Sequence, residues 1–515
     1  MAGTVVAISS ELPPRTSSVF MPQQGAEEPT GGSQSVRSSR EGRETVWSQG
    51  TQESGSVKGP MNEAKPATVG SKGASPDFPK QAGEAQEVMA WVERCIWTER
   101  MLKRLATSQE QTKWYSLWDK VCRPENLDQA IFKVILNRGS PGVDGYTTGQ
   151  LQAEWARQRD QLRQELLEGR YRPKPARRAW IPKLGSAELR PLGIPAVRDR
   201  VVQTALRAVL EPIFEREFAA QSHGFRPQHS ALHALEQVES LLQAGYIWIV
   251  DADLKQYFDT IPHGRLMELI KRRVADGRVI KLLEQYLAAG VMESHTGWKP
   301  TQEGTPQGAV ISPLLANLYL NALDHLMMAK GYQMVRYADD FVVCAKTEAE
   351  AHAALAEIRA WVQEAGLQLH PTKTRIVNAA EKGGFDFLGY HFEQYHQGGG
   401  KKWPRKKSQF KLRETLREKL PRKRGASMVE IVADVNKTLR GWYGYFKYSL
   451  PSAMQRVDEW TRERIRHILR RRQRRRGMVR GRERTEYPIA WFEQRGLFSL
   501  KAAQAKWLQS LAGNH

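Results

Sequence analysis

The sequence predicts an α+β fold, in which short apolar strands lie among long amphipathic helices and a helical section follows. Three observations support this class. The run Tyr246–Val250 is continuously apolar, as in a buried central strand. β-branched and aromatic residues flank Asp339 and Asp340 on both sides, which predicts two strands joined by a turn. From Lys401 onward the chain becomes strongly basic and helical in pattern.

Composition limits the kinds of protein that this chain can be. Its 515 residues exceed one compact domain, so we expect three or four. A net charge of +22 indicates a polyanionic partner, with nucleic acid as the first expectation and an anionic membrane surface as the competitor. No run of about 18 apolar residues is present, so no membrane span is expected. Three cysteines and a start without a secretion signal predict a reducing, intracellular compartment.

The N-terminal third contains a low-complexity extension and then helices. Residues 1–85 are rich in Ser, Gly, Pro, Glu and Gln and poor in aromatics, which predicts disorder. Helical patterns cover Glu84–Leu105 and then Trp114–Leu136. A loop dense in turn residues, Asn137–Gly145, separates them from another amphipathic helix.

The acidic turn is the strongest candidate for a metal site. Asp339 and Asp340 are adjacent at the predicted tip, and two such carboxylates repel each other unless a cation neutralises them. Mg²⁺ prefers hard oxygen ligands of this kind. Asp251 and Asp253, at the end of the apolar strand, share one face of it, and either could join the cluster. The alternative for the tetrapeptide alone is an acidic turn on a surface hairpin.

Two cations and one loop are candidates for binding a nucleotide. Lys183 and Arg190 lie on two short strands around a Gly-Ser turn, where both could point at one polyphosphate. The alternative is a pair of solvated surface cations, which spacing alone favours. The loop Gly304–Pro313 is punctuated by Gly and Pro, and such small residues let a backbone approach a ligand closely. An ordinary loop is its alternative.

The basic C-terminal section is a candidate for binding RNA. Leu439–Phe446 interleaves Arg440 with aromatic residues, among them Trp442 and Tyr445, and aromatic rings stack on bases. A basic helix over 462–476 then carries two arginine triplets: Arg470, Arg471 and Arg472, followed by Arg474, Arg475 and Arg476. Basic residues contact phosphates, although a solvated charged helix would have the same composition. The net charge of the whole chain favours nucleic acid.

The order of these motifs is more specific than any one of them. From about Trp114 onward the chain resembles the group II intron-encoded reverse transcriptases and maturases of bacteria. The matching segments are 142–145 (Gly-Val-Asp-Gly), 190–195 (Arg-Pro-Leu-Gly-Ile-Pro), 197–200, 223–227 (His-Gly-Phe-Arg-Pro), 253–259, 305–308 (Thr-Pro-Gln-Gly), 312–313, 337–340 (Tyr-Ala-Asp-Asp), 373–375, 387–389 (Phe-Leu-Gly) and 439–442. The last segment resembles the maturase region, which viral reverse transcriptases lack.

The resemblance implies a right-hand polymerase with fingers, palm and a helical thumb, and it implies a role for each matching residue. Asp253, Asp339 and Asp340, assisted by the Leu254 carbonyl, are expected to bind two Mg²⁺ ions. Nucleotide binding is expected of Lys183, Arg190, Phe258, Gln307, Gly308 and Lys373, with Phe258 excluding ribonucleotides. Phe387, Leu388 and Gly389 are expected to support the primer end.

These roles predict five segments. They are a disordered extension (1–85), fingers with N-terminal helices (86–245), palm (246–395), thumb and maturase region (396–480) and a short C-terminal segment (481–515). Many relatives end in an endonuclease with paired cysteines, and no cysteine lies beyond Cys344, so we expect no endonuclease here.

The resemblance predicts an RNA-directed DNA polymerase that is also a splicing maturase, promoting intron mobility. Its expected partners are a group II intron RNA, an RNA template with a DNA primer, a DNA target and dNTPs, with no membrane. A bacterial cytoplasmic location, at the nucleoid through the DNA target, follows. Two alternatives are a non-enzymatic RNA-binding splicing cofactor and a domesticated reverse transcriptase in repair or defence.

Overall fold

The computed structural model describes residues 91–512 apart from 110, 183–188, 294–296, 397–398, 422–424 and 476. The predictions made for the extension 1–85, for Lys183 and for Arg476 fall outside the described residues. Among the described residues, no helix is long and apolar enough to cross a bilayer.

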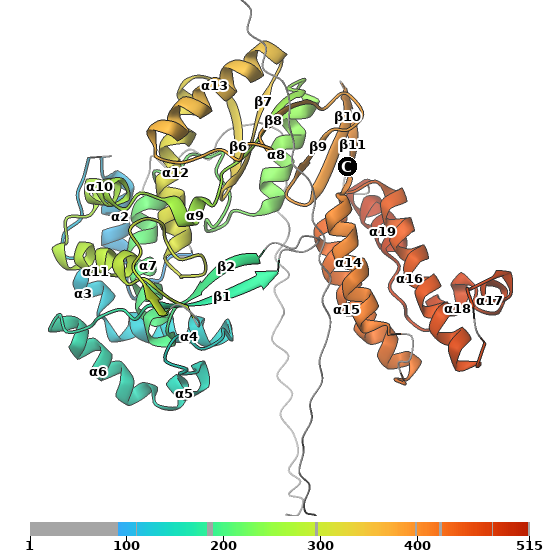
Figure 1. The fold of residues 1–515 in the computed structure, drawn as a ribbon, viewed down its shortest axis with the longest axis horizontal. Helices are drawn as coiled ribbons and strands as arrows, with labels where there is room; N and C mark the ends of the chain where they lie inside the picture. The colour runs from blue at the N-terminus through green and yellow to red at the C-terminus, as the bar shows by residue number, and fades with distance from the viewer. Residues whose placement is uncertain are drawn as a thin grey trace, which may run out of the picture. The chain divides into compact units, whose positions relative to one another are not determined.

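The N-terminal part is helical (Figure 1). Its helices are α2 (Glu99–Thr107), α3 (Trp118–Val121), α4 (Pro124–Leu136), α5 (Thr148–Ala153) and α6 (Trp155–Leu167). The prediction of one helix over Glu84–Leu105 was wrong for residues 91–98, which form turns. There the buried Trp97 donates its indole N–H to the Ala208 carbonyl at 3.3 Å, a tertiary contact that overrides the local helical pattern. Pro124 starts α4, as expected of a residue without a backbone N–H.

A small sheet follows these helices, in the order β2-β1-β4-β5. Its strands are β1 (Ala176–Pro182), β2 (Leu189–Ile194), β4 (Val291–Glu293) and β5 (Gly297–Lys299). The predicted hairpin around the Gly-Ser turn is present, because β1 pairs antiparallel with β2 and Ile181 lies opposite Arg190. The neighbouring helices are α7 (Val197–Glu215), α8 (Ala231–Gln243), α9 (Tyr257–Thr260), α10 (His263–Arg273) and α11 (Gly277–Ala288).

The central sheet is fully antiparallel, with the order β6-β7-β3-β8. Its strands are β6 (Gln333–Tyr337), β7 (Asp340–Ala345), β3 (Trp248–Asp253) and β8 (Arg375–Asn378). The predicted strand–turn–strand around Asp339 and Asp340 is therefore confirmed. One face of the sheet, with Val250 and Phe341, belongs to the same core cluster as residues of α12 (Ser312–Ala329) and α13 (Glu348–Glu364).

The opposite face of the central sheet carries the carboxylates. Because side chains alternate along a strand, Asp251 and Asp253 share this face with Ile249. Ile249 belongs to a second core cluster with α8 and a third sheet, ordered β11-β10-β9. The third sheet and the helices after it are β9 (Phe385–Phe387), β10 (Tyr390–His396), β11 (Gly399–Pro404), α14 (Lys406–Lys419), α15 (Met428–Phe446), α16 (Pro451–Arg472), α17 (Gly481–Glu486), α18 (Ile489–Gln494) and α19 (Leu500–Ala512).

Candidate active site

The sheet register brings the predicted carboxylates together. Asp253, the last residue of β3, lies directly opposite Asp340, the first residue of β7. Residues opposed in this way point to the same face of an antiparallel sheet, so Asp251, Asp253 and Asp340 share it. Asp339 lies in the adjoining turn, where it interacts electrostatically with Asp253. Four carboxylates from two segments far apart in the sequence therefore meet at one end of the sheet.

Burial and the close packing of these carboxylates raise the pKa of two of them, Asp339 and Asp340. Burial, followed by the charges of Asp251, Asp339 and Asp253, raises the pKa of Asp340 to about 7. Burial also raises the pKa of Asp339, and Asp253 adds to this shift while Arg190 opposes it. Such mutual repulsion disfavours the ionised state unless a cation approaches.

Two cations face this cluster, Lys373 just before β8 and Arg375 at its start. The Lys373 ammonium forms an ion pair with the Asp253 carboxylate, and Arg375 Nε donates to Asp251 Oδ2 at 3.2 Å. Hard carboxylate oxygens are the donors that Mg²⁺ prefers, so the chemistry of the cluster suits that ion. In this arrangement of side chains, however, no group of three or more Asp, Glu, His or Cys among the described residues is placed to hold a metal.

The acidic turn is held by a buried cation that the sequence analysis missed. Arg336 is fully buried on β6 and donates to the Ala338 carbonyl at 2.9 Å and to Asp324 Oδ1 at 2.8 Å. Ala338 itself has φ +61°, a strained conformation for a residue with a Cβ. An arginine inside an apolar strand was the available signal, because such a residue requires a buried partner.

The loop with His223 packs directly on the turn. Asn317 on α12 donates to the Gly224 carbonyl at 2.7 Å, and it also accepts from Arg336 at 3.0 Å. A Cβ on Gly224 would lie only 2.1 Å from the Ala338 nitrogen, so this position requires glycine. The loop and the turn therefore form one rigid unit beside the carboxylates.

The predicted nucleotide-binding loop lies against β2. The Gly193 N–H donates to the Gln307 carbonyl at 2.7 Å. Gly308 has φ +111°, and a Cβ there would come within 2.8 Å of the Gly193 oxygen. Arg190 on β2 is exposed and lowers the pKa of Asp339, which places its charge near the turn. The structure therefore packs Gln307 and Gly308 against the strand that carries Arg190, whose charge acts on the acidic turn.

Phe258 lies on α9 beside two further rings. Its ring is 6.4 Å from the Phe225 ring, which is in turn 6.5 Å from the Tyr337 ring of the acidic turn. Phe225 is 43% exposed and has φ +61°. Its exposure and its place next to Gly224 make Phe225 a further candidate for contacting substrate. In the sequence, Phe225 stands out only as part of the matching segment 223–227.

Comparison with known proteins identifies the two halves of this arrangement. Residues 181–392 match the model of the reverse transcriptase family (RNA-dependent DNA polymerase), and residues 409–487 match the maturase-specific domain of group II introns. Protein YkfC of Escherichia coli is 36% identical over 333 residues, which cover 57% of this chain and 86% of YkfC. The chain belongs to the family of group II intron reverse transcriptases and maturases. The predicted family and fold class are confirmed, and the reverse transcriptase domain bears out the predicted enzyme class.

Other matches are partial. The group II intron-encoded protein LtrA of Lactococcus lactis is 43% identical over 165 residues, which are 32% of this chain but only 27% of LtrA. Among solved structures, a partial Cas6-RT-Cas1–Cas2 complex is 22% identical and covers 48% of this chain and 42% of that one. Its TM-score is 0.31, too low to support an argument.

The predicted primer-end residues of this reverse transcriptase end β9 (Phe387) and form the turn to β10 (Leu388 and Gly389). Phe387 is buried in the second core cluster, while Leu388 and Gly389 have φ +46° and +88°. Tyr445 on α15 donates its hydroxyl to the Leu388 carbonyl at 2.7 Å. Tyr445, which the sequence analysis assigned to RNA, thus contacts the primer-end turn, and Asp340 and Tyr337 are among its electrostatic neighbours.

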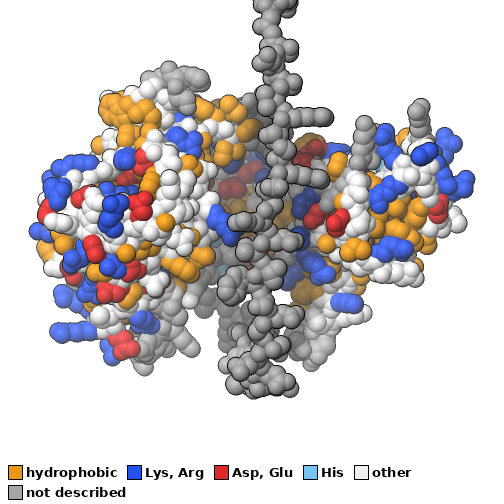
Figure 2. Space-filling model, turned by 90° about the horizontal axis from the view of Figure 1, so that it is seen from below, with side chains coloured by type: hydrophobic (Ala, Val, Ile, Leu, Met, Phe, Trp, Pro, Cys, Tyr) orange, Lys and Arg blue, Asp and Glu red, His pale blue; other side chains and the backbone are white. Residues whose placement is uncertain are grey.

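Of the other predicted RNA-binding residues, Arg440 and Trp442 lie on α15, Arg470, Arg471 and Arg472 end α16, and Arg474 and Arg475 follow it. Figure 2 shows Lys and Arg side chains around an apolar patch in this region. Arg440 is exposed and stacks on Phe498 at 4.5 Å, and Trp442 packs on Phe446 at 4.6 Å. The triplets differ from residue to residue. Arg470 pairs with Glu483, Arg475 pairs with Glu486 at 3.1 Å, and Arg472 donates to a carbonyl, whereas Arg471 and Arg474 are exposed.

Proposed function

We propose that the chain copies RNA into cDNA by nucleotidyl transfer with two Mg²⁺ ions, which Asp253, Asp339, Asp340 and the Leu254 carbonyl would hold. The observation that carries the proposal is Asp253 opposite Asp340, with Asp339 in the adjoining turn of a reverse transcriptase domain. Divalent ions serve this family generally. When bound, they would activate the primer 3′-hydroxyl and neutralise the triphosphate and leaving group.

The remaining site residues bind and orient the substrates. Arg190 and Lys183 bind the triphosphate, and Gln307 and Gly308 line the nucleotide pocket. Phe258 presses on the sugar and excludes a 2′-hydroxyl. Lys373 exchanges its partner Asp253 for the incoming nucleotide, which suits a lysine ammonium as a mobile point charge. The turn Phe387–Gly389 supports the primer end.

The second activity in this proposal is that of a maturase. The match of residues 409–487 to the maturase-specific domain supports binding of a group II intron RNA and assistance in its splicing. We assign 86–245 to fingers, 246–395 to palm, 396–480 to thumb and maturase region and 481–515 to a short C-terminal segment. A DNA target at the nucleoid completes the proposed set of partners.

Primer extension on an RNA template with dNTPs and Mg²⁺ tests the polymerase. We expect the parent to extend the primer and Asp339→Asn to lose at least about a thousandfold in rate, because a transition-state ligand is removed. Asp160→Asn, an exposed carboxylate change on α6, is the matched control and should extend normally. A folded parent that binds RNA but extends no primer would overturn the polymerase and favour a splicing cofactor.

A further inference from the structure

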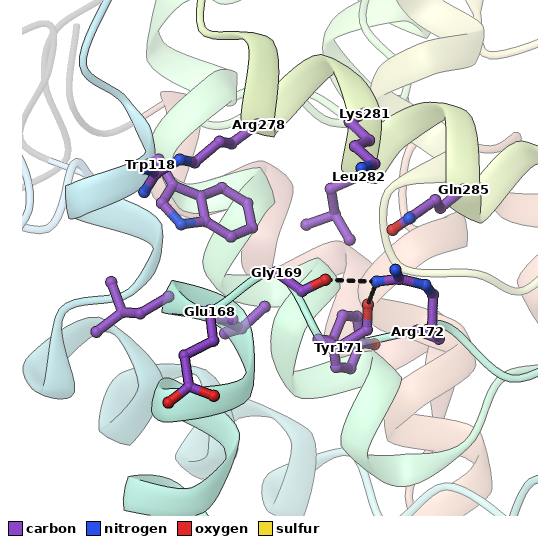
Figure 3. Close-up of a pocket in the computed structure, with 11 residues that line it drawn as sticks. Trp118, Glu168, Gly169, Tyr171, Arg172, Arg278, Lys281, Leu282 and Gln285 are labelled. Carbon is purple, nitrogen blue, oxygen red and sulfur yellow. Dashed lines mark hydrogen bonds between the residues drawn. The ribbon is translucent and has the colours of Figure 1, made fainter.

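A concave site lies between helices of the N-terminal part and α11, formed by residues that the polymerase mechanism does not use. The cavity measures about 290 Å³ and lies between α3, the end of α6 and α11 (Figure 3). Its apolar wall consists of Trp118, Leu166 and Leu282, each at most 8% exposed. Small-ligand sites begin at about 300 Å³ and combine such a wall with a few polar groups.

Three cations and one amide converge on this wall. In Figure 3, Arg278 extends toward Trp118, while Lys281, Gln285 and Arg172 lie along the other side. Among the described residues, no carboxylate lies within ion-pair distance of Arg172, Arg278 or Lys281, whereas many other cations of the chain are paired. The one acidic residue of the lining, Glu168, pairs with Arg170 and points away from the cations.

The cavity is held open by specific hydrogen bonds. Asp276, the N-cap of α11, accepts from the backbone N–H groups of Leu117 and Trp118 at 2.8 and 2.9 Å and from Arg278 N–H at 3.1 Å. This carboxylate therefore fixes α3 against the start of α11. On the opposite side, Arg172 Nη1 donates to the carbonyls of Gly169 and Tyr171 at 2.6 and 2.8 Å.

We propose that this cavity binds a nucleoside 5′-phosphate, either as a free mononucleotide or as one unpaired nucleotide of an RNA strand. The cations suit a phosphate, because forked guanidinium donors bind its oxygens. The Trp118 side suits a base, because every base offers an apolar face to an aromatic or aliphatic wall. The RNA form of the proposal rests on the proposed function, whereas the free form does not.

The test is equilibrium binding of AMP and of an unstructured oligoadenylate to the full chain at fixed salt. We expect the double variant Arg278→Ala/Lys281→Ala to weaken the affinity about tenfold, since two charge-assisted contacts are lost. Gln285→Glu, which adds a carboxylate to the cavity, should weaken it as well. Arg272→Ala, an exposed cation of α10 outside the cavity, is the matched control.

The outcomes distinguish a free nucleotide from an RNA strand as the ligand, and this cavity from the polymerase site. If the double variant loses affinity for oligoadenylate only, the cavity binds RNA. If it loses affinity for AMP, the cavity binds a free nucleotide. Variants that melt like the parent and bind both probes like the parent overturn the proposal, as does competition by inorganic phosphate as effective as AMP. Primer extension is measured in parallel and should be unchanged by these variants, so that failure of the polymerase is distinguishable from failure of this site.

Discussion

The acidic turn of the central sheet and the arginine run that begins at the end of α16 (residues 470–475) are both dense in one charge, but the fold neutralises them to different extents. At the turn, Asp339 and Asp340 lie beside Asp251 and Asp253. Arg375 and Lys373 pair with the latter two, yet burial and the neighbouring carboxylates still raise the pKa of Asp340. In the arginine run, Arg470 and Arg475 pair with Glu483 and Glu486 of α17. Like charges that the fold leaves close together indicate a ligand, whereas charges that it pairs internally indicate a structural clamp.

The largest expected effect comes from substituting a carboxylate of the acidic turn. Asp340→Asn should lower the rate of primer extension at least about a thousandfold, because a proposed metal ligand is lost. The same change should stabilise the fold without Mg²⁺ by about 1 kcal/mol, since it removes a like charge from a partly buried cluster. Primer extension and chemical denaturation measure the two effects. A variant that is both active and less stable would contradict the interpretation.

Substitutions in the ion pairs of the arginine run should lower the stability of the fold rather than the polymerase activity. Glu483 is fully buried and pairs with the partly buried Arg470, so Glu483→Gln removes a buried charge from this ion pair. We expect the melting temperature to fall by several degrees. Arg471→Gln, an exposed member of the same triplet, should leave it unchanged but weaken RNA binding. Equal effects of the two substitutions on melting would show that the triplet is not a clamp.

The acidic turn and the arginine run also differed in how much of their structure the sequence predicted. The strands around Asp253 and Asp339 follow from local apolar patterns, and a strand that ends in a carboxylate places it at a sheet edge. The pairing of Arg470 with Glu483 depends on a turn after α16 that no periodicity indicates. Likewise, the partner of Arg336 lies on α12, and the start of α2 is set by contacts of Trp97 with α7. Local patterns predicted elements and charges, but not which charges would be paired.

The pH dependence of stability sharpens the comparison. Asp340 has a folded pKa of about 7, above its ordinary value, so the native state binds the proton more tightly than the unfolded state. Its contribution to stability is therefore present at about pH 4 and is lost as the pH rises through about 7. Without Mg²⁺, we expect the advantage of Asp340→Asn over the parent to grow as the pH rises across this interval, because only the parent loses this proton.

Melting curves of both proteins across the same interval, with and without Mg²⁺, provide the measurement. Mg²⁺ should stabilise the parent more at pH 8 than at pH 5, because only the ionised cluster binds it. A difference between the two proteins that does not change with pH would show that Asp340 does not titrate in this range.

The smallest predicted effect concerns Tyr445, which belongs to the basic section by sequence but contacts the polymerase side. Its hydroxyl donates to the Leu388 carbonyl, and Tyr390 donates to the Tyr445 carbonyl at 2.6 Å. Tyr445→Phe removes one hydrogen bond and keeps the ring, so we expect the KM for primer–template to rise about threefold while RNA binding is unchanged. Tyr443→Phe, in the same helix, is the matched control.

These two variants separate a positioning role from an RNA-binding one. If Tyr445→Phe weakens binding of RNA without changing the KM for primer–template, the residue contacts RNA and the original sequence interpretation holds. If the KM rises and the KM for dNTP does not, the hydroxyl positions the turn that supports the primer. In that case a residue of the maturase-specific domain completes the polymerase site, and the two activities cannot be divided at a domain boundary.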